Sequence, residues 1–385
     1  IFALSEKFDG AILNEDNFRV TDKEIEEAYD MVDDDYIFSI RKAIERIAVF
    51  HNKQMKNSWM EPDEQGNILG QKYRPLERVG IYVPGGTAAY PSSVLMNAIP
   101  AQVAGVPEIV MVSPPSRDGR LNPYTLVAAA ELGLEEIYKM GGAQAVFALA
   151  WGTETVKKVD LISGPGNIYV TIAKKMVYGD VNIDMLAGPS EILIVADETA
   201  DPAYIAADLL SQAEHGVDSS AVVLTDSQRV AEGILDELGR QLVTLPRAAE
   251  AMESLRRFSR VIVVRDLDEA VRLADEFASE HLEIQCGMRS GEVARRITNA
   301  GAIFIGSWTP EAIGDYVGGP NHVLPTARSA RFSSGLGVLD FMKRTSILKC
   351  GPDQLRALGP AAMTLGKAEG LEAHARSVGL RLNLS

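Results

Sequence analysis

The chain has five histidines, and four of them lie in segments with other side chains that can bind a metal or transfer a proton. These four are His215, His281, His322 and His374. Gln212 and His215 are three residues apart, so both side chains would leave one face of a helix and could share a metal ion. An ordinary solvated helix face is the commoner meaning of this spacing, and that alternative stays open.

Two further segments could complete a ligand set. Asp315 lies between Gly314 and Tyr316, and His374 ends the segment Glu369-Gly-Leu-Glu-Ala-His374. Imidazole, carboxylate and amide groups suit zinc, or manganese less tightly, and the absence of thiolates argues against a closed structural site. The spacing in sequence does not show that the four side chains meet.

Glu280 and His281 are adjacent and precede a predicted strand over residues 282–285. A carboxylate beside an imidazole offers two bases of different strength, enough for one proton abstraction and one activation of water. A surface pair near a helix C-terminus is the alternative. The segment Asn321-His322 also has two possible interpretations, a conformationally special turn or a contact with the substrate.

Three glycine-rich turns follow predicted strands: Pro84-Gly85-Gly86-Thr87, Gly141-Gly142-Ala143-Gln144 and Gly164-Pro165-Gly166-Asn167. Each would let the backbone approach a ligand at the carboxyl end of a strand. Any one of them fits an ordinary turn, whereas three in succession favour a nucleotide-like ligand. Tyr169 stands where the dinucleotide fingerprint GxGxxG requires a small residue, so the motif itself is lacking.

The elements that must position these groups follow from the hydrophobic pattern. The first eighty residues read as helical, with a capping box at Thr21 and Glu24. Apolar runs that alternate with helical windows then predict parallel βαβ units. The predicted strands are 79–83, 109–112, 137–140 and 161–163, and in a second series 191–196, 221–224, 261–264 and 302–305.

This pattern predicts an α/β protein with two Rossmann-like doubly wound domains. We expect an N-terminal helical segment (1–78), a first domain with the glycine-rich turns (79–186), a second domain with most of the candidate metal-binding and proton-transferring residues (187–335) and a C-terminal helical tail (336–385). The helical stretch after Pro352 is too short for its own core and must dock on a larger surface. Because the sequence begins with Ile1 rather than Met, we expect residues before it in the complete protein.

The composition of the chain limits the classes of molecule that it can bind. A net charge of −15 argues against nucleic acid or an anionic membrane, because phosphates would be repelled. Three prolines interrupt the uncharged stretch 79–107, which excludes a membrane helix there. The two cysteines, Cys286 and Cys350, lack any CxxC spacing and fit a reducing cytoplasm.

Nine separated segments, in one order over nearly the whole chain, together resemble histidinol dehydrogenase. They are Tyr82-Val-Pro-Gly-Gly, Gly141-Gly-Ala-Gln144, Gly164-Pro-Gly-Asn167, Ala187-Gly-Pro-Ser190-Glu, Ser211-Gln-Ala-Glu-His215, Ser279-Glu-His-Leu282, Gly314-Asp-Tyr316, Asn321-His-Val-Leu-Pro-Thr326 and Glu369-Gly-Leu-Glu-Ala-His374. The stretch Ala327-Arg-Ser-Ala-Arg331 resembles the family less closely.

The resemblance implies a ligand set for one zinc ion per subunit: Gln212, His215, Asp315 and His374. It implies that NAD contacts Tyr82, Gln144 and Asn167. The substrate would be held by Ser190, His322 and Glu369, together with His281 and the four zinc ligands. It further implies a homodimer whose C-terminal tails deliver Glu369 and His374 to the partner's active site.

In the chemistry that the resemblance implies, His281 takes the proton of the alcohol as hydride passes to a first NAD. Glu280 then activates water on the aldehyde before hydride passes to a second NAD. The substrate would be L-histidinol, oxidised through L-histidinaldehyde to L-histidine in the last steps of histidine biosynthesis.

Other functions fit parts of the pattern. A dehydrogenase on the same scaffold could oxidise another small alcohol, such as a sulfonated diol, although Ser190, Glu369 and His322 weigh against it. A zinc hydrolase could use Glu280 on metal-bound water and would turn over without NAD. A cysteine nucleophile at Cys286 and an inert binding protein are weaker alternatives.

Overall fold

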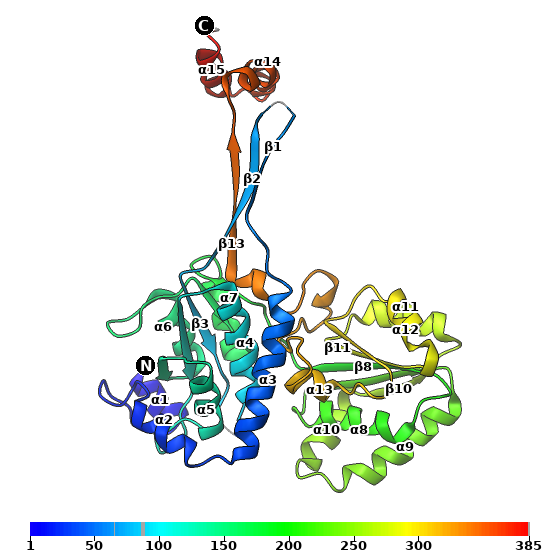
Figure 1. Cartoon of the computed structure of the whole chain (residues 1–385). Coiled ribbons are helices and arrows are strands. Elements are labelled where there is room, and N and C mark those ends of the chain that lie inside the picture. The colour runs from blue at the N-terminus through cyan, green and yellow to red at the C-terminus, as the bar shows by residue number, and fades with distance from the viewer. Residues whose placement is uncertain (65, 86–88, 384–385) are drawn as a thin grey trace. The chain divides into compact units, whose positions relative to one another are not determined.

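The computed structural model describes residues 1–64, 66–85 and 89–383, so Gly86 and Thr87 of the first glycine-rich turn lie outside the described residues. The chain forms two compact units. Unit 1 consists of Ile1–Gln54 and Leu76–Phe341, and unit 2 of Met55–Pro75 and Met342–Ser385. Figure 1 labels their helices and strands.

The first half of unit 1 contains a five-stranded parallel sheet with the order β5-β4-β3-β6-β7. The strands are β3 (Arg78–Tyr82), β4 (Glu108–Ser113), β5 (Glu136–Lys139), β6 (Leu161–Ser163) and β7 (Asn182–Ile183). Between them run α4 (Pro91–Ala104), α5 (Pro123–Glu131), α6 (Gly142–Trp151) and α7 (Ile168–Val177). The chain starts in the middle of the sheet and moves outward in both directions, so a topological switch point lies between β3 and β6.

The second half repeats this topology with the order β10-β9-β8-β11-β12. Its strands are β8 (Glu191–Ala196), β9 (Ser220–Thr225), β10 (Arg260–Val263), β11 (His281–Gln285) and β12 (Ala302–Ile305). Its helices are α8 (Pro202–Ala213), α9 (Gln228–Leu242), α10 (Ala248–Phe258), α11 (Leu267–Phe277), α12 (Ser290–Arg296) and α13 (Glu311–Tyr316), with 3-10 turns η1 (Gly287–Arg289), η2 (Ser329–Arg331) and η3 (Val338–Phe341). The two predicted doubly wound sheets are confirmed, and the expected boundary after residue 186 falls between β7 and β8.

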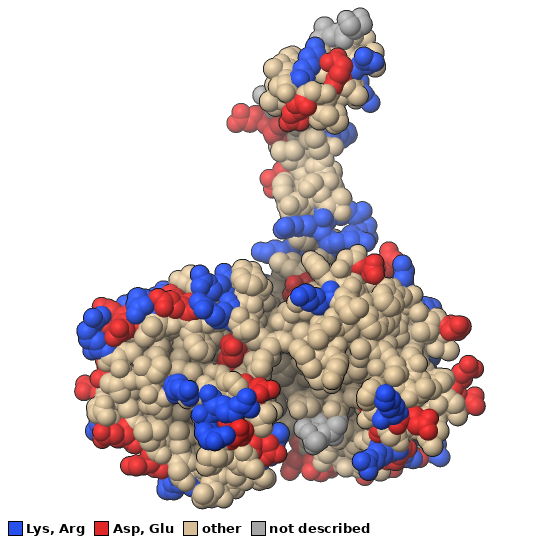
Figure 2. All heavy atoms as spheres, turned by 180° about the vertical axis from the view of Figure 1, so that it is seen from behind, with Lys and Arg blue, Asp and Glu red and all other residues tan. Residues whose placement is uncertain are grey.

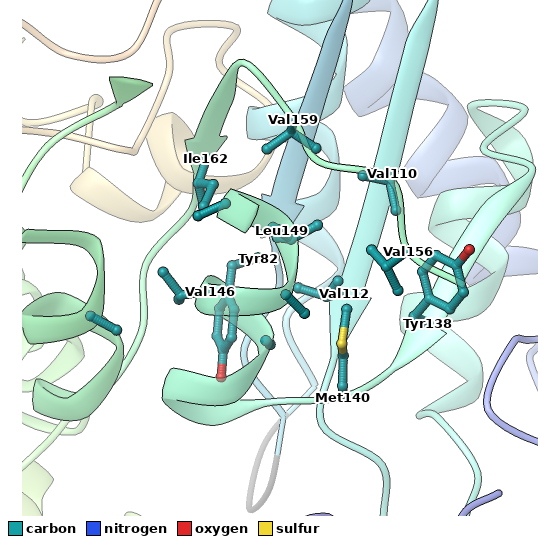
Figure 3. Close-up of a cluster of buried hydrophobic side chains, with 14 of the residues drawn as sticks. Tyr82, Val110, Val112, Tyr138, Met140, Val146, Leu149, Val156, Val159 and Ile162 are labelled. Atoms are coloured by element: carbon teal, nitrogen blue, oxygen red, sulfur yellow. The ribbon is translucent and has the colours of Figure 1, made fainter. Parts of the chain in front are cut away.

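Apolar clusters on both faces of the sheets explain why the strands appear in the sequence as continuous apolar runs. In Figure 3, Tyr82, Val110 and Val112 of the first sheet pack against Val146 and Leu149 of α6. Full burial of one such aliphatic side chain contributes about 1.5–3 kcal/mol. These clusters therefore hold the strands whose ends carry the polar residues. None of the helices in the described ranges is long and apolar enough to cross a membrane.

The N-terminal helices belong to unit 1. They are α1 (Phe2–Phe8), α2 (Asp22–Tyr29) and α3 (Asp34–Asn52), of which α2 packs on α5 and α3 on α4. The capping box predicted at the start of α2 is confirmed. The N–H of Glu24 donates to Thr21 Oγ1 at 3.3 Å, and the N–H of Thr21 donates to Glu24 Oε2 at 3.0 Å.

Unit 2 corrects the prediction of an all-helical segment up to residue 78. Residues 59–75 instead form β1 (Trp59–Pro62) and β2 (Ile68–Pro75), in an antiparallel sheet with the order β1-β2-β13. Strand β13 (Met342–Lys349) lies about 270 residues further along the chain, counted from its register with β2. The pairing of β2 with β13 leaves no local signal, and all three strands are mostly exposed or half-buried, so the hydrophobic pattern missed them.

The helical tail after Pro352 is confirmed as α14 (Pro352–Ala368) and α15 (Glu372–Arg381), which pack on each other. Gly359 allows their close approach, because a Cβ there would lie 2.6 Å from a methyl group of Leu382. Figure 2 shows a band of basic side chains across the strands of unit 2. Arg74 of β2 and Lys343 of β13 are partners in the register of these strands.

Candidate active site

The predicted acid-base pair lies at the amino end of the second sheet. His281 is the first residue of β11, an inner strand that pairs with β8 on one side and β12 on the other. Glu280 directly precedes it. Both residues are buried, with only 6% and 3% of their surface exposed for Glu280 and His281. Burial of two ionisable side chains side by side requires close polar partners.

Glu191, the first residue of β8, supplies backbone partners to both members of the pair. Its N–H donates to Glu280 Oε2 at 2.9 Å, and its carbonyl oxygen lies 3.1 Å from His281 Nδ1. The side chain of Glu191 in turn accepts from the N–H of Ala327 at 3.1 Å. Ala327 and Arg328 both have a positive φ, of 52° and 66°, so this loop is held in a strained conformation beside the pair.

Two further carboxylates from α13 approach the imidazole. Glu311 Oε1 lies 3.5 Å from His281 Nδ1, and Asp315 Oδ1 lies 3.6 Å from His281 Nε2. Because Glu311 and Asp315 are four residues apart, they leave the same face of the helix. Ligand atoms of the three residues lie within 4.8 Å of one another, which is close enough to hold one cation.

Burial and charge compete in this cluster. Burial lowers the pKa of His281, but the charges of Glu280 and Glu311 outweigh it and raise the pKa to about 10. Burial raises the pKa of Glu280 to about 7 and that of Glu311 to about 8. For Asp315 burial is outweighed by the contact with His281 and the nearby charge of His322, so its pKa lies below the ordinary value.

Gln212 and His215 stand at the C-terminal end of α8. Gln212 is fully buried, and neither its Oε1 nor its Nε2 has a hydrogen-bond partner. His215 follows just beyond the helix, where its Nδ1 lies 2.9 Å from the carbonyl oxygen of Ser211 and leaves Nε2 for another partner. The charge of His215 also acts on the carboxylate of Asp315. The structure thus places His215 near Asp315, and Gln212 lies three residues before His215 at the end of α8.

Unpartnered polar atoms indicate that this neighbourhood fits a cation. Among the described residues, buried atoms without a hydrogen-bond partner include both amide atoms of Gln212, both oxygens of Glu311, Oδ1 of Asp315 and Nε2 of His281. Buried polar atoms are normally satisfied, and each one left alone costs about 1–3 kcal/mol. A bound divalent ion would satisfy several at once, and the mixed nitrogen and oxygen donors are those that zinc or manganese accepts.

Two overlapping ligand sets share Asp315. One is the predicted set with Gln212 and His215, and the other is the cluster with His281 and Glu311. Glu311 has no distinguishing signal in the sequence, because an acidic residue in the first turn of a helix is ordinary. Its burial at 2% exposure, a property of the tertiary packing, is what distinguishes it.

The segment from Asn321 to Thr326 combines a structural and a site role. Asn321 is structural, since its side chain donates to the carbonyl of Met96 at 2.6 Å and accepts from the N–H of Val323 at 2.8 Å. His322 is half-buried beside Asp315, with its Nδ1 3.0 Å from the carbonyl oxygen of that residue. Ser190 is half-buried and directly precedes Glu191, next to the acid-base pair.

Glu369 and His374 belong to unit 2. Glu369 is the C-cap residue of α14 and His374 lies in the first turn of α15, and both are exposed. The geometry given above for unit 1 therefore involves neither of them, and their assignment to the substrate and to the metal stays a prediction.

The predicted cofactor residues gather at the opposite end of the other sheet. Tyr82 ends β3, and the glycine-rich turns follow β5 and β6 at the same carboxyl edge. Tyr82 Oη accepts from the N–H of Gly142 at 2.9 Å, so the side chain ties two of the turns together. Gly164 has a φ of +115°, and a Cβ there would overlap the carbonyl oxygen of Tyr82.

Helices α6 and α7 begin at this edge. The Oδ1 of Asn167 accepts from the N–H groups of Tyr169 and Val170 at 3.0 and 3.2 Å and so caps α7, while Gln144 lies half-buried in the first turn of α6. The positive ends of two helices thus lie at the carboxyl edge of a doubly wound sheet, where such sheets bind their ligands. This edge fits the pyrophosphate of a dinucleotide.

A buried ion pair fixes the turn after β6, and the sequence analysis missed it. Lys174 on α7 pairs with Asp184 and also donates to the carbonyl of Gly164 at 2.9 Å. Asp184 accepts from the N–H of Gly164 at 2.8 Å. An isolated lysine on a helix looks solvent-exposed in sequence, so only its burial reveals this function.

The segment that precedes β8 links two regions. One is the carboxyl edge of the first sheet, which carries the predicted cofactor residues and is called the cofactor edge below. The other is the cluster around Glu280 and His281. Thr171 on α7 donates to the carbonyl of Ala187 at 3.4 Å, and the N–H of Gly188 donates to Thr326 Oγ1 at 2.6 Å. A groove of about 800 Å³ on the second sheet touches Glu191 but is otherwise lined by residues outside the site, mainly Leu193, Val222 and Phe277. The unpartnered atoms, rather than this groove, therefore locate the candidate site.

Known proteins match the chain along its whole length. The family model for histidinol dehydrogenase matches residues 1–382. The histidinol dehydrogenase of Nitrobacter winogradskyi is 59% identical over 377 residues, covering 98% of this chain and 87% of the relative, and that of Heliobacterium mobile is 54% identical over 382 residues, covering 99% and 89%. The crystal structure of histidinol dehydrogenase from Elizabethkingia anophelis, 40% identical, superposes with a TM-score of 0.95 over 99% of this chain and 88% of that one. By sequence and by fold, the chain belongs to the histidinol dehydrogenase family.

Proposed function

We propose that the chain is a zinc-dependent enzyme that oxidises L-histidinol through L-histidinaldehyde to L-histidine with two NAD, in the last steps of histidine biosynthesis. The observation that carries the proposal is the position of the buried pair Glu280-His281 beside the unpartnered Oδ1 of Asp315, which lies 3.6 Å from His281 Nε2. The family name of its relatives supports the choice of substrate.

His281 acts as the base that takes the proton of the alcohol. The carbonyl of Glu191 lies next to Nδ1, which leaves Nε2, without a hydrogen-bond partner, for the substrate hydroxyl. The carboxylates around the ring favour the imidazolium in the metal-free state and would also stabilise the imidazolium that forms in the reaction. The positive charge of a zinc ion held by Asp315 would lower the pKa of His281, so that the ring is neutral before it takes the proton. The same residue serves both oxidations, because each one releases a proton from an oxygen.

Glu280 acts between the two oxidations. Its Oε2 is held by the N–H of Glu191, and its other oxygen is left to take a proton from water as that water adds to the aldehyde carbon. Burial raises the pKa of Glu280 to about 7, so the carboxylate can accept and release this proton near neutral pH.

Gln212, His215 and Asp315, with His374 of the partner subunit, would hold zinc, which when bound supplies a positive charge that orients the amino alcohol. Ser190, His322 and Glu369 of the partner subunit would contact the rest of the substrate. Tyr82, Gln144 and Asn167 would hold NAD, the hydride acceptor, at the carboxyl edge of the first sheet.

The proposal includes a homodimer with shared active sites in a reducing cytoplasm. The two cysteines, Cys286 and Cys350, are unpaired in the structure, which agrees with that compartment. To test the shared site, His281→Ala subunits would be mixed with His374→Ala subunits. If random exchange makes half of the dimers mixed, about a quarter of all sites should regain activity. A mixture that stays inactive despite confirmed exchange would refute sharing.

The function itself is tested by NADH formation from histidinol and from histidinaldehyde, before and after treatment with a chelator. We expect activity to vanish on chelation, to return with zinc, and to be absent in His215→Ala, whose zinc content should also fall. Turnover without NAD would indicate a hydrolase, and faster NADH formation with another alcohol would indicate a different substrate.

A further inference from the structure

The strand that begins at His281 carries two more buried polar side chains, which have no part in the mechanism above. Glu283 and Gln285 follow at i+2 and i+4, so they lie on the same face of β11 as His281. They are 1% and 3% exposed. Leu282 and Ile284 between them point to the other face, into an apolar cluster. An inner parallel strand normally carries apolar side chains on both faces, so the polar face of β11 requires a reason.

Glu283 is linked to both helices that carry proposed zinc ligands of unit 1. Its Oε1 accepts from the N–H of Glu311, the first residue of α13, at 2.8 Å. Its Oε2 accepts from Nε2 of Gln285 at 3.0 Å, and the same amide donates to Oδ2 of Asp208 on α8 at 3.0 Å. The chain of contacts thus runs from α8 across β11 to α13.

Each end of this chain of contacts lies one helical turn from a proposed ligand. Asp208 precedes Gln212 by four residues, and Glu311 precedes Asp315 by four. Helix α13 has only six residues and cannot be stable by itself, so its contacts decide where Asp315 points. At its other end, Arg46 of α3 donates to the carbonyl of Val317 at 2.8 Å.

We propose that Glu283 is a positioning residue that sets the distance between Gln212 and Asp315 and thereby the affinity of the site for its metal ion. The inference rests on the proposed function, because it takes these two residues as ligands. Burial and the neighbouring carboxylate of Asp208 raise the pKa of Glu283, which favours a carboxyl group that shares a proton with Asp208. A glutamine at this position keeps both the acceptor and a donor, whereas an alanine has neither.

The test measures the zinc dissociation constant by competition with a fluorescent chelator in the purified protein. We expect Glu283→Gln to bind zinc within about threefold of the unchanged protein, and Glu283→Ala to bind it about 10–100-fold more weakly. Glu136→Gln is the matched control, because Glu136 accepts two hydrogen bonds from Arg78 in the first sheet, away from the ligands. It should leave the zinc affinity unchanged even if it lowers stability.

A folded Glu283→Ala protein with unchanged zinc affinity would overturn the inference. If Glu283→Ala does not fold, Asp208→Ala is measured instead, since it keeps the contact of Glu283 with Glu311 and removes the link to α8, both through Gln285 and through the shared proton. Weaker zinc binding in Asp208→Ala supports the inference, and unchanged binding overturns it. His215→Ala separates the two proposals. If both Glu283→Ala and His215→Ala bind zinc normally, the proposed ligand set is wrong. If only His215→Ala loses zinc affinity, the role of Glu283 alone is refuted.

Discussion

The two sheets of unit 1 have the same strand order, yet their polar residues gather at opposite ends. In the first sheet, Tyr82, Gln144 and Asn167 lie at the carboxyl edge, where α6 and α7 begin. In the second, Glu280 and His281 lie at the amino end of β11, near the end of α8. The strand order of a doubly wound sheet therefore does not determine at which edge its polar residues gather.

The difference has an electrostatic meaning. Helices that begin at an edge present N–H groups and partial positive charge, which suits a phosphate, whereas a helix that ends there presents carbonyl groups and partial negative charge. Gln212 and His215 lie at the negative end of α8. The carboxylates of Glu311 and Asp315 lie around His281, at the amino end of β11. One edge thus favours an anionic cofactor and the other a cation.

The largest expected effect belongs to His281. We expect His281→Asn to lower kcat by about 10²–10⁴-fold for both histidinol and histidinaldehyde, because one base serves both oxidations. Steady-state NADH formation measures the loss, and the dissociation constant of NAD should not change. A loss confined to NAD binding would mean that the two edges are not functionally separate.

Replacement of Glu280 should slow only the second oxidation, from histidinaldehyde to histidine. Glu280→Gln keeps an acceptor for the N–H of Glu191 but cannot take a proton from water. Oxidation of histidinaldehyde should fall about 10²–10⁴-fold, while the first oxidation, followed in a single turnover, stays close to normal. Equal losses in both steps would assign Glu280 a structural or shared role.

The pH dependence of stability should distinguish the metal-free protein from the zinc-loaded one. Glu280 and Glu311 have a raised pKa, so between their ordinary values and about 7 to 8 the folded state binds more protons than the unfolded state. The stabilisation from the raised pKa of His281 is likewise lost as the pH rises toward 10. Stability of the metal-free protein should therefore decrease as the pH rises from 5 to 9.

Thermal unfolding measures this effect, as a melting temperature that falls by roughly 2–4 °C for each kcal/mol of stability lost. Glu311→Gln removes one of the titrating carboxyls and should flatten the dependence. A metal-free protein that becomes more stable over this range would contradict the described surroundings of the two carboxyls.

The smallest effect is expected at the cofactor edge. Tyr82→Phe removes one hydrogen bond to the N–H of Gly142 and keeps the aromatic packing. A net loss of about 0.5–1.5 kcal/mol corresponds to a KM for NAD raised about 2–13-fold. The zinc affinity should be unaffected, and a change in it would show that the two edges are coupled.

Local patterns in the sequence revealed much of the fold. The buried strands of both sheets stand out as apolar runs, and Thr21 with Glu24 marks a helix start. The pairing of β2 with β13 could not be predicted, because the two strands lie far apart in the chain. The nine segments of the resemblance directed attention to residues such as Gln212, whose spacing alone was uninformative.

Other parts of the site have no sequence signal. Glu283, Glu311 and Lys174 are charged residues in otherwise ordinary elements, and only burial shows that they must have partners. Whether α13 packs beside β11 depends on contacts such as that of Arg46 with Val317, which join segments about 270 residues apart. Sequence spacing describes one element at a time and does not report such packing.

The most direct test is an anomalous difference map, recorded at the zinc absorption edge, from crystals of the zinc-loaded protein. The account predicts one peak in each site, in contact with Gln212, His215 and Asp315 at the amino edge of the second sheet. A peak held by His281 and Glu311 with Gln212 and His215 free, or a peak at the carboxyl edge of the first sheet, would contradict it.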